Sequence, residues 1–408
     1  MGLFRNRRYL ATGGSPGKNT WRQLLRNPVS LASMVFIGLA AGIAVAGYLV
    51  SPDHTPFANR QTLEISTKKP GFRVDILKIR KNRPSQARGW LGTMLFGSPD
   101  DHLHVPVDTL VFSEESIRFR RYTGDSIGIW EEVSLADAVL PLSTADSLPA
   151  EAGTYLLADS SLARINKAEL ESEARKQLTT RRFLLGTDRF GRDLLSRLLI
   201  GTRVSLSVGL IAVFISLLLG ISLGSLAGFF KGRTDDAILW LINVVWSIPT
   251  LLLVIAITFA LGKGFWQVFV AVGLTMWVEV ARVVRGQILS IREKEYVEAA
   301  RALGYSSLRI IRRHILPNVM APVIVISAAN FASAILIEAG LSFLGIGVQP
   351  PMPSWGTMIR ENYAYIILDK AYLAVMPGLC IMLLVLAFML LGNTLRDVLD
   401  VRYQPSNG

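Results

Sequence analysis

Long apolar blocks, separated by charged segments, dominate the pattern of hydrophobic and polar positions along this chain of 408 residues. A helix needs about 20 apolar residues to cross roughly 30 Å of hydrocarbon, and soluble proteins spread theirs over shorter amphipathic pieces. Only helices or closed barrels satisfy their backbone groups in lipid, and these blocks lack the alternation of barrel strands. The pattern therefore predicts an all-α polytopic membrane protein with six transmembrane helices. The predicted spans are residues 30–50, 205–229, 237–261, 266–283, 320–344 and 372–392.

The segment between the first two predicted spans, residues 51–184, is long enough to form a small domain. Apolar and polar residues alternate in several parts of it, as expected for strands that bury one face. Residues 160–182 are predicted to be helical, because Leu162, Ile165 and Leu170 fall near one face and charges fall elsewhere. We expect a β-rich insertion with one helix on the extracytoplasmic side. The candidate strands are residues 72–76, 108–112 and 117–119.

The formal net charge of +12 is concentrated in two segments. Residues 1–29 hold six Arg or Lys and no acid, and residues 282–317 hold eight Arg or Lys against three Glu. Short basic segments stay on the cytoplasmic side of a membrane, so this excess indicates topology and removes the main support for nucleic-acid binding. With six spans, both termini are expected in the cytoplasm, including the tail 401–408. The predicted location is the cell inner membrane, with the lipid bilayer as a partner.

Few residues are candidates for catalytic or metal chemistry. The single cysteine, Cys380, excludes an intramolecular disulfide and a cysteine-rich metal site. His102 and His104 have no third ligand nearby in the sequence and are interpreted as surface residues. The glycine-rich residues 13–19 lack the spacing of a phosphate loop and are interpreted as a flexible basic lead. We expect no cofactor, no metal and no enzymatic activity. Block 30–50 exceeds the roughly 7–15 apolar residues of a cleaved signal and is interpreted as an uncleaved anchor.

Four residues in or beside the spans are candidates for a gate or pathway. Pro249 removes an N–H inside the third predicted span and is expected to kink it. Glu279 and Glu338 would each cost roughly 2.5–3.5 kcal/mol facing lipid at the bilayer centre, so we expect them to face the bundle interior, water or headgroups. They are also open to interpretation as a proton relay. Trp355 lies in a proline-rich stretch, 345–356, which is either a rigid connection or a periplasmic gate or binding-protein contact.

The loop before the fifth predicted span, residues 284–317, carries the most informative pattern. It reads as a short helix, a glycine break, a second basic helix, and a proline before the membrane. Small side chains on one helical face would let another protein approach, and the glycine supplies the freedom for a sharp turn. The proline is expected to end the cytoplasmic helix. An ordinary solvated loop is the alternative. The defining residues are Glu298, Ala299, Ala300, Gly304, Leu316 and Pro317.

The spacing of these residues resembles the EAA loop of binding-protein-dependent ABC transporter permeases. That pattern is E-A-A, three residues, G, nine residues, I, one residue, L-P, and His314 departs from it at the isoleucine position. Further stretches look like the dipeptide, oligopeptide and nickel branch, and the chain is similar to its second permease subunit. The resemblance covers about 185–400, the expected permease core, and leaves the insertion without a counterpart. The further stretches are residues 185–193, 247–249 and 340–356.

The resemblance implies a division of labour between several chains. The EAA helix would dock into a groove on a cytoplasmic ATP-binding subunit. Closure of the ATPase dimer would then switch this chain and a homologous permease subunit between inward- and outward-facing states. An extracytoplasmic substrate-binding protein would deliver di- or oligopeptides. Three alternatives stay open: import of nickel or another small solute, an ion-coupled secondary transporter, and a membrane-anchored sensory protein whose outer domain is the active part.

Overall fold

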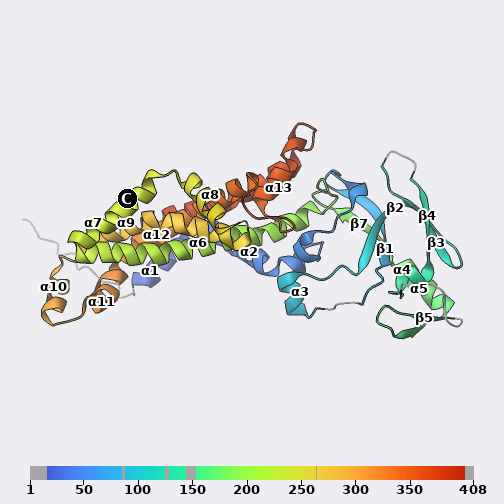
Figure 1. The fold of residues 1–408 in the computed structure, drawn as a ribbon, viewed down its shortest axis with the longest axis horizontal. Helices are drawn as coiled ribbons and strands as arrows, with labels where there is room; N and C mark the ends of the chain where they lie inside the picture. The colour runs from blue at the N-terminus through green and yellow to red at the C-terminus, as the bar shows by residue number, and fades with distance from the viewer. Residues whose placement is uncertain (1–15, 85–87, 125–127, 144–152, 263, 400–408) are drawn as a thin grey trace, which may run out of the picture.

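A helical bundle and a β-sheet domain lie at opposite ends of an elongated molecule (Figure 1). The computed structural model describes residues 16–84, 88–124, 128–143, 153–262 and 264–399. The long helices run side by side in the bundle, and the sheet domain is inserted between the first of them and the rest. This arrangement confirms the predicted fold class.

Five helices in the described residues are long and apolar enough to cross a membrane. Helix α6 begins eleven residues before its predicted span, at Leu194, because the Asp193 carboxylate caps it there by accepting the Ser196 N–H at 2.9 Å. Its 37 residues make it about 55 Å long at 1.5 Å per residue, so it projects beyond the hydrocarbon layer. A short helix, α1 (Pro16–Arg26), precedes them. The five are α2 (Pro28–Val50), α6 (Leu194–Phe230), α9 (Phe265–Ile291), the continuous helix Ser307–Phe343 and α14 (Tyr372–Leu399).

The third predicted span is broken rather than kinked. Helices α7 (Gly232–Ser247) and α8 (Thr250–Leu261) pass the membrane test only as a pair, and they are bent by 96°. Ile248 is extended, with φ −94° and ψ 129°, which is the conformation favoured before a proline. Pro249 has no N–H to continue α7. The predicted effect of the proline is thus found at the predicted place, and it is stronger than a kink.

Helices α6 and α9 approach closely along a stripe of glycines at four-residue spacing, Gly220, Gly224 and Gly228. A Cβ added at Gly224 would lie 2.6 Å from the carbonyl oxygen of Ala281, and one added at Gly220 would lie 2.5 Å from the Cβ of Val280. Small residues at this spacing let membrane helices pack backbone against backbone. The core of the bundle therefore depends on the absence of side chains at these positions.

The sheet domain contains a five-stranded antiparallel sheet in the order β4-β3-β2-β1-β7. The strands predicted at 72–76, 108–112 and 117–119 lie within β1, β2 and β3. Helices α4 and α5 pack their buried side chains against apolar residues of the sheet. The strands are β1 (Phe72–Arg80), β2 (His102–Phe112), β3 (Ser116–Arg121), β4 (Trp130–Ser134) and β7 (Leu178–Phe183), with a hairpin of β5 (Thr154–Leu156) and β6 (Leu162–Arg164); the helices are α3 (Trp90–Phe96), α4 (Leu135–Val139) and α5 (Lys167–Lys176).

The prediction of one helix over residues 160–182 is wrong. Only α5 is helical, and it begins where the Asn166 side chain accepts the N–H of Glu169 at 2.8 Å. Leu162 lies in β6, and the segment after α5 becomes β7 because it pairs with β1, about a hundred residues earlier in the chain. Such long-range pairing overrides local helical propensity.

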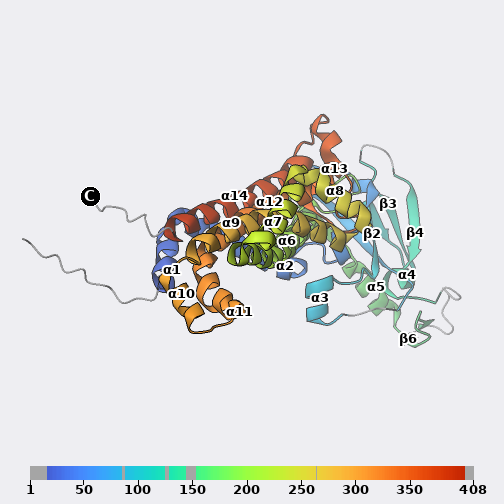
Figure 2. The same ribbon diagram turned by 60° about the vertical axis from the view of Figure 1, so that its left-hand side comes forward.

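The end of the bundle away from the sheet carries a small helical hairpin (Figures 1 and 2). Between the last two long helices, a connecting segment folds back onto the bundle at the other end. The elements of these two regions are α10 (Glu295–Ala302), α11 (Ser307–Ile310), the π turn Ile311–Ile315, α12 (Leu316–Phe343), α13 (Trp355–Asn362) and the 3-10 turn Tyr363–Ile366.

Candidate functional site

The hairpin formed by α10 and α11 is closed by a glycine in the left-handed conformation. Gly304 has a φ of +76°. The N–H of Tyr305 donates to the carbonyl of Ala300 at 3.1 Å, and the N–H of Gly304 donates to the carbonyl of Arg301 at 2.9 Å. This pair of bonds is the Schellman motif, which requires a positive φ at the position of Gly304. The sharp turn predicted at this glycine is therefore present, and its backbone geometry explains the residue type.

The inner face of α10 packs on the ends of α6 and α9. Val297 and Ala300 are buried there beside Phe229 and Ile288. The prediction that both alanines offer a small surface to another protein is therefore wrong for Ala300, which turns inward. Its small side chain serves packing within the chain.

Polar contacts fix the base of the same hairpin. The Arg292 Nη1 donates to the carbonyl of Phe229 at 2.6 Å, and the Lys231 Nζ donates to Glu293 Oε1 at 3.0 Å. The hydrogen bond and charge of Lys231 lower the pKa of the exposed Glu293 carboxyl. The hairpin is thus attached to α6 and α9 by both apolar and polar contacts, so a force on it reaches these helices.

The outer face of the hairpin is exposed and unoccupied by the rest of the chain. Glu298 and Ala299 are exposed, and Leu303 and Leu308 expose 72% and 64% of their surface. Within the described residues, no hydrogen bond or ion pair engages the Glu298 carboxylate. An apolar surface with a free carboxylate is typical of a protein contact.

The prediction that Pro317 ends the helix is wrong. The helix continues from Ser307 to Phe343 through a π turn, in which the N–H of Leu316 donates to the carbonyl of Ile311, five residues back. The widened turn shifts the hydrogen-bond register just before Pro317, which lacks an N–H and is tolerated in the first turn of α12. The hairpin is therefore continuous with a membrane-length helix.

His314, which departs from the resembled pattern, has a structural role in this π turn. Its ring stacks on Tyr305 with 6.0 Å between centroids, and the Asn318 Nδ2 donates to its carbonyl at 2.8 Å. The ring thereby holds the loop that follows Gly304 against the long helix.

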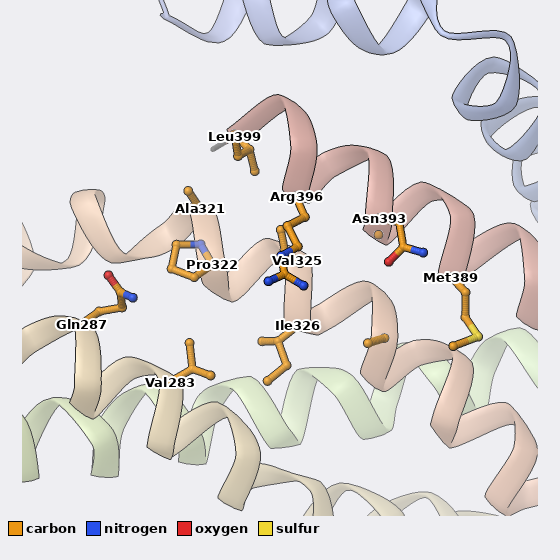
Figure 3. Close-up of a pocket in the computed structure, with 12 residues that line it drawn as sticks. Val283, Gln287, Ala321, Pro322, Val325, Ile326, Met389, Asn393, Arg396 and Leu399 are labelled. Carbon is orange, nitrogen blue, oxygen red and sulfur yellow. The ribbon is translucent and has the colours of Figure 1, made fainter. Parts of the chain in front are cut away.

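A furrow between α9 and α12 contains Glu279. One hollow of about 350 Å³ lies beside the α7–α8 bend, and a second of about 660 Å³ lies further toward the hairpin, bordered also by α14. Figure 3 shows Gln287, Asn393 and Arg396 around the second hollow. The two hollows have no lining residue in common, but they follow one stripe of α9 and one of α12, and we call this surface between the two helices the furrow. The stripes are Thr275, Glu279, Val283 and Gln287 on α9, and Pro322, Val325, Ala329 and Ser333 on α12.

The bend between α7 and α8 forms one rim of this furrow. Trp246 and Thr250 border it, with the exposed Pro249 between them. The Arg282 guanidinium lies 3.3 Å from the centre of the Trp246 ring, and its Nη2 donates to Asn243 Oδ1 at 3.3 Å. The contacts of Arg282 thus hold α7 against α9, and polar groups lie on the exposed surface beside the bend.

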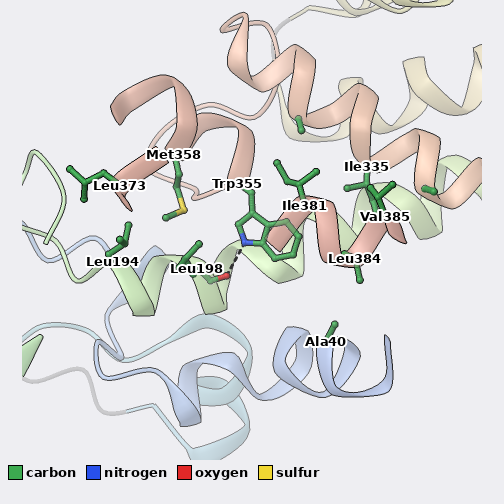
Figure 4. Packing of buried hydrophobic residues seen from close by; sticks show 12 residues of the cluster. Ala40, Leu194, Leu198, Ile335, Trp355, Met358, Leu373, Ile381, Leu384 and Val385 are labelled. Atoms are coloured by element: carbon green, nitrogen blue, oxygen red, sulfur yellow. Dashed lines mark hydrogen bonds between the residues drawn. The ribbon is translucent and has the colours of Figure 1, made fainter. Parts of the chain in front are cut away.

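Glu338 and Trp355 lie inside the bundle, away from this furrow. Glu338 is fully buried and accepts the Ser342 hydroxyl at 2.6 Å, while the same hydroxyl accepts the Val348 N–H at 3.1 Å. The Trp355 Nε1 donates to the carbonyl of Leu198 at 3.0 Å among buried apolar side chains (Figure 4). Both residues hold the segment 345–356 in place. Of the four candidate pathway residues, the structure brings together Pro249 and Glu279.

Residues 185–193 contribute to a buried cluster of four charges. The Arg192 Nε lies 2.6 Å from Asp188 Oδ2 and its Nη2 lies 2.6 Å from Glu361 Oε2. Arg197 lies 3.7 Å and 3.5 Å from the same two carboxylates, so two positive and two negative charges balance. The cluster joins the start of α6 to α13. The sequence analysis does not single out Arg197 or Glu361. The one local feature that could have drawn attention to this cluster is Arg197 itself, a charged residue in the first turn of an apolar helix.

His104 lies in the sheet domain beside Asp100, to which its Nε2 donates at 3.2 Å. Burial lowers the pKa of His104. Burial also opposes ionisation of Asp100, but the hydrogen bond from His104 and the charge of Arg60 outweigh it and hold the pKa of that carboxyl well below its usual range. In the part of the chain that the structure describes, no group of three potential metal ligands occurs.

Comparison with known proteins identifies relatives of both the bundle and its first helix. The family model described as "Binding-protein-dependent transport system inner membrane component" matches residues 220–405, and the model described as "N-terminal TM domain of oligopeptide transport permease C" matches residues 15–67. The segment between the two matches, which contains the sheet, is covered by neither.

Three relatives illustrate the likeness. The "Di/tripeptide transport system permease protein DppC" of Pseudomonas aeruginosa is 46% identical over 54% of this chain and 72% of its own length. The "Glutathione transport system permease protein GsiD" of Pectobacterium atrosepticum is 41% identical over 53% of this chain and 71% of its length. The "Oligopeptide transport system permease protein OppC" of Bacillus subtilis is 38% identical over 53% and 70%.

Proposed function

The chain belongs to the family of binding-protein-dependent transport system inner membrane components, and we propose that it is one of two related permease subunits in an ATP-driven importer of short peptides. The relatives named for di/tripeptides, glutathione and oligopeptides support this substrate class. All three names describe molecules with a peptide backbone and a size of a few residues.

The α10–α11 hairpin carries the proposal, because its two faces have different surroundings. The inner face is packed and hydrogen-bonded to the ends of α6 and α9, while the outer face exposes Leu303, Leu308 and the free carboxylate of Glu298. A separate cytoplasmic ATP-binding subunit is the proposed partner of that outer face. When the ATP-binding subunits close, they displace the hairpin, and the continuous helix 307–343 transmits the displacement into the membrane.

The furrow between α9 and α12 is the proposed wall of the pathway. Glu279 is exposed in it, and an ionised carboxylate facing lipid at the bilayer centre would cost roughly 2.5–3.5 kcal/mol. Water and a second permease subunit across the furrow remove this cost. A furrow open along one side also requires a partner to close it, which supports a pair of permeases rather than a lone chain.

A proton relay through Glu279 and Glu338 is disfavoured. Glu279 lines the open furrow, whereas Glu338 is enclosed in the bundle and bonded to Ser342. The two carboxylates therefore lie in separate environments, and Glu338 is assigned to positioning the segment 345–356. This separation favours ATP-driven transport over an ion-coupled secondary transporter.

The proposed orientation places the hairpin and both termini in the cytoplasm of the cell and the sheet domain outside. The hairpin region carries Arg301, Arg309, Arg312 and Arg313, as expected for a short segment retained on the cytoplasmic side. The bent pair α7–α8 then counts as one membrane crossing, so the chain crosses the membrane six times. An extracytoplasmic substrate-binding protein would meet the face near the sheet.

Reconstituted transport tests the proposal. Proteoliposomes holding this chain, its partner permease and ATP-binding subunits should take up a labelled dipeptide when ATP and the binding protein are supplied. The purified chain alone, with a proton or sodium gradient, should take up none. Uptake by the chain alone would establish the secondary transporter instead, and uptake of nickel with no uptake of peptide would correct the substrate class.

A further inference from the structure

Helix α3 (Trp90–Phe96) is a short helix with apolar side chains on its outside. None of its seven residues is buried, and Trp90 and Phe96 expose 68% and 64% of their surface; Leu91 and Leu95 are also exposed. Figures 1 and 2 both show α3 at the side of the molecule, near the junction of the bundle with the sheet domain, where it contacts α2. A soluble domain rarely displays such an apolar helix to water.

The guanidinium of Arg203 fixes the level of α3 relative to the membrane-spanning helix α2. Its nitrogens donate to the carbonyls of Ala44 and Val45 in α2, at 2.7 and 3.0 Å. They also donate to the carbonyls of Leu95 and Met94 in α3, at 2.5 and 3.2 Å. Since α2 continues for five residues beyond Val45 and rises 1.5 Å per residue, the end of α3 lies about 8 Å inside the end of that span.

The free backbone carbonyls at the end of α3 are satisfied without water. The last four carbonyls of a helix have no partner in the helix. Here Arg203 binds those of Met94 and Leu95, and Arg88 Nη1 binds those of Phe96 and Gly97 at 3.3 and 3.1 Å. Two side chains thus satisfy all four groups, which meets the main requirement for a helix end in a medium poor in water.

The exposed surface of α3 continues into surface that faces lipid. Val45, Leu49 and Val50 near the end of α2 are exposed and apolar, as expected for a span that meets acyl chains. Between α3 and α6 lies a hollow of about 510 Å³, lined mainly by apolar side chains such as Phe57 and Phe265. The hollow, α3 and the end of α2 together form one continuous apolar surface.

We propose that α3 is an interfacial helix, which inserts its apolar side chains among the headgroups and upper acyl chains of the leaflet beside the sheet domain. A depth of roughly 5–10 Å, an exposed tryptophan and flanking arginines are the properties of helices that lie in this layer. The helix anchors the long connection between β1 and β2 to the bilayer. The sheet domain is thereby held close to the membrane surface.

Fluorescence quenching in the assembled transporter tests this placement. A single cysteine at Leu91→Cys, in a Cys380→Ser background, is labelled with an environment-sensitive dye and the full complex is placed in lipid nanodiscs. Val45→Cys on α2 is the matched lipid-facing control, and Leu103→Cys, an exposed leucine of β2, is the control in the sheet domain. Nitroxide-bearing phospholipid and iodide are the two quenchers.

Lipid nitroxides should quench the dye at position 91 at least half as strongly as at position 45, and iodide should quench it several-fold less than at position 103. A dye at position 91 that responds to iodide and not to lipid would overturn the proposal, because α3 would then lie in water. A dye protected from both quenchers would also overturn it, because a protein partner would then cover α3. Trp90→Cys gives an independent second position if the first variant assembles poorly.

Discussion

Replacing Gly304 by valine should uncouple ATP hydrolysis from transport without preventing membrane insertion. Gly304 has a φ of +76°, where an L-residue with a Cβ loses about 1–2 kcal/mol and a β-branched residue at least the upper value. No heavy atom lies within 4 Å of an added Cβ, so the cost comes from the backbone alone. About 2 kcal/mol shifts the equilibrium roughly thirtyfold against the closed turn.

The variants should show a graded effect, because the backbone and not the side-chain volume sets the cost. Asparagine tolerates positive φ, so the asparagine variant should retain most of the peptide uptake. The alanine variant should lose about 1 kcal/mol of turn stability and part of the uptake. The valine variant should lose nearly all of the uptake. The assay compares peptide uptake with ATP hydrolysis in proteoliposomes that hold equal amounts of each complex. Normal uptake by the valine variant would refute the assignment of the turn, and an asparagine variant as poor as valine would refute the role of φ.

Four further substitutions probe other parts of the structure. Glu361→Gln leaves a buried positive charge uncompensated and should destabilise the protein by about 3–5 kcal/mol, visible as a lower thermal midpoint in detergent; an unchanged midpoint would contradict the charge balance. Gly224→Val places atoms against a backbone carbonyl 2.6 Å away and should cost at least about 1–3 kcal/mol, whereas Gly38→Val, with open space around it, should cost little; equal losses would show that the stripe is not a tight contact. Glu279→Ala should lower peptide uptake several-fold with unchanged thermal stability, since the side chain is exposed in the furrow, and normal uptake would remove it from the pathway. Because burial lowers the pKa of His104, a fall in pH through about 6.5 protonates the unfolded state first and should weaken hydrogen-exchange protection of the sheet; His104→Gln should remove most of this dependence, and an equal dependence in that variant would exclude the histidine as its source.

The spans and the turn were predictable because local features determine them. Each apolar block is long enough to be recognised by itself, and Gly304 and Pro249 constrain the backbone through their own chemistry. The degree of bending at Pro249 was less predictable, since it depends on how α7 is held to α9, for example by the Arg282 and Trp246 contact. The position of the break is therefore predictable from the proline, whereas the angle between α7 and α8 depends on tertiary packing.

The remaining features depend on contacts between distant segments. β7 becomes a strand because it pairs with β1, and Ala300 turns inward because the ends of α6 and α9 lie beneath it. Glu361 meets Arg192 across 169 residues of sequence, so no local spacing connects them. The separation of Glu279 from Glu338 has the same origin, since it depends on which face of α9 and of α12 the bundle buries.

Site-specific photo-crosslinking from the hairpin tests the central assignment most directly. A photoreactive amino acid is placed at Ala299, on the exposed outer face, and at Leu103 in the sheet domain as the control, and the intact complex is irradiated in native membranes. Position 299 should crosslink to an ATP-binding subunit, with a yield that changes when nucleotide is added, and position 103 should not. If residue 299 crosslinks to no such subunit, or reacts with an impermeant reagent from outside the cell, the hairpin is not the coupling element.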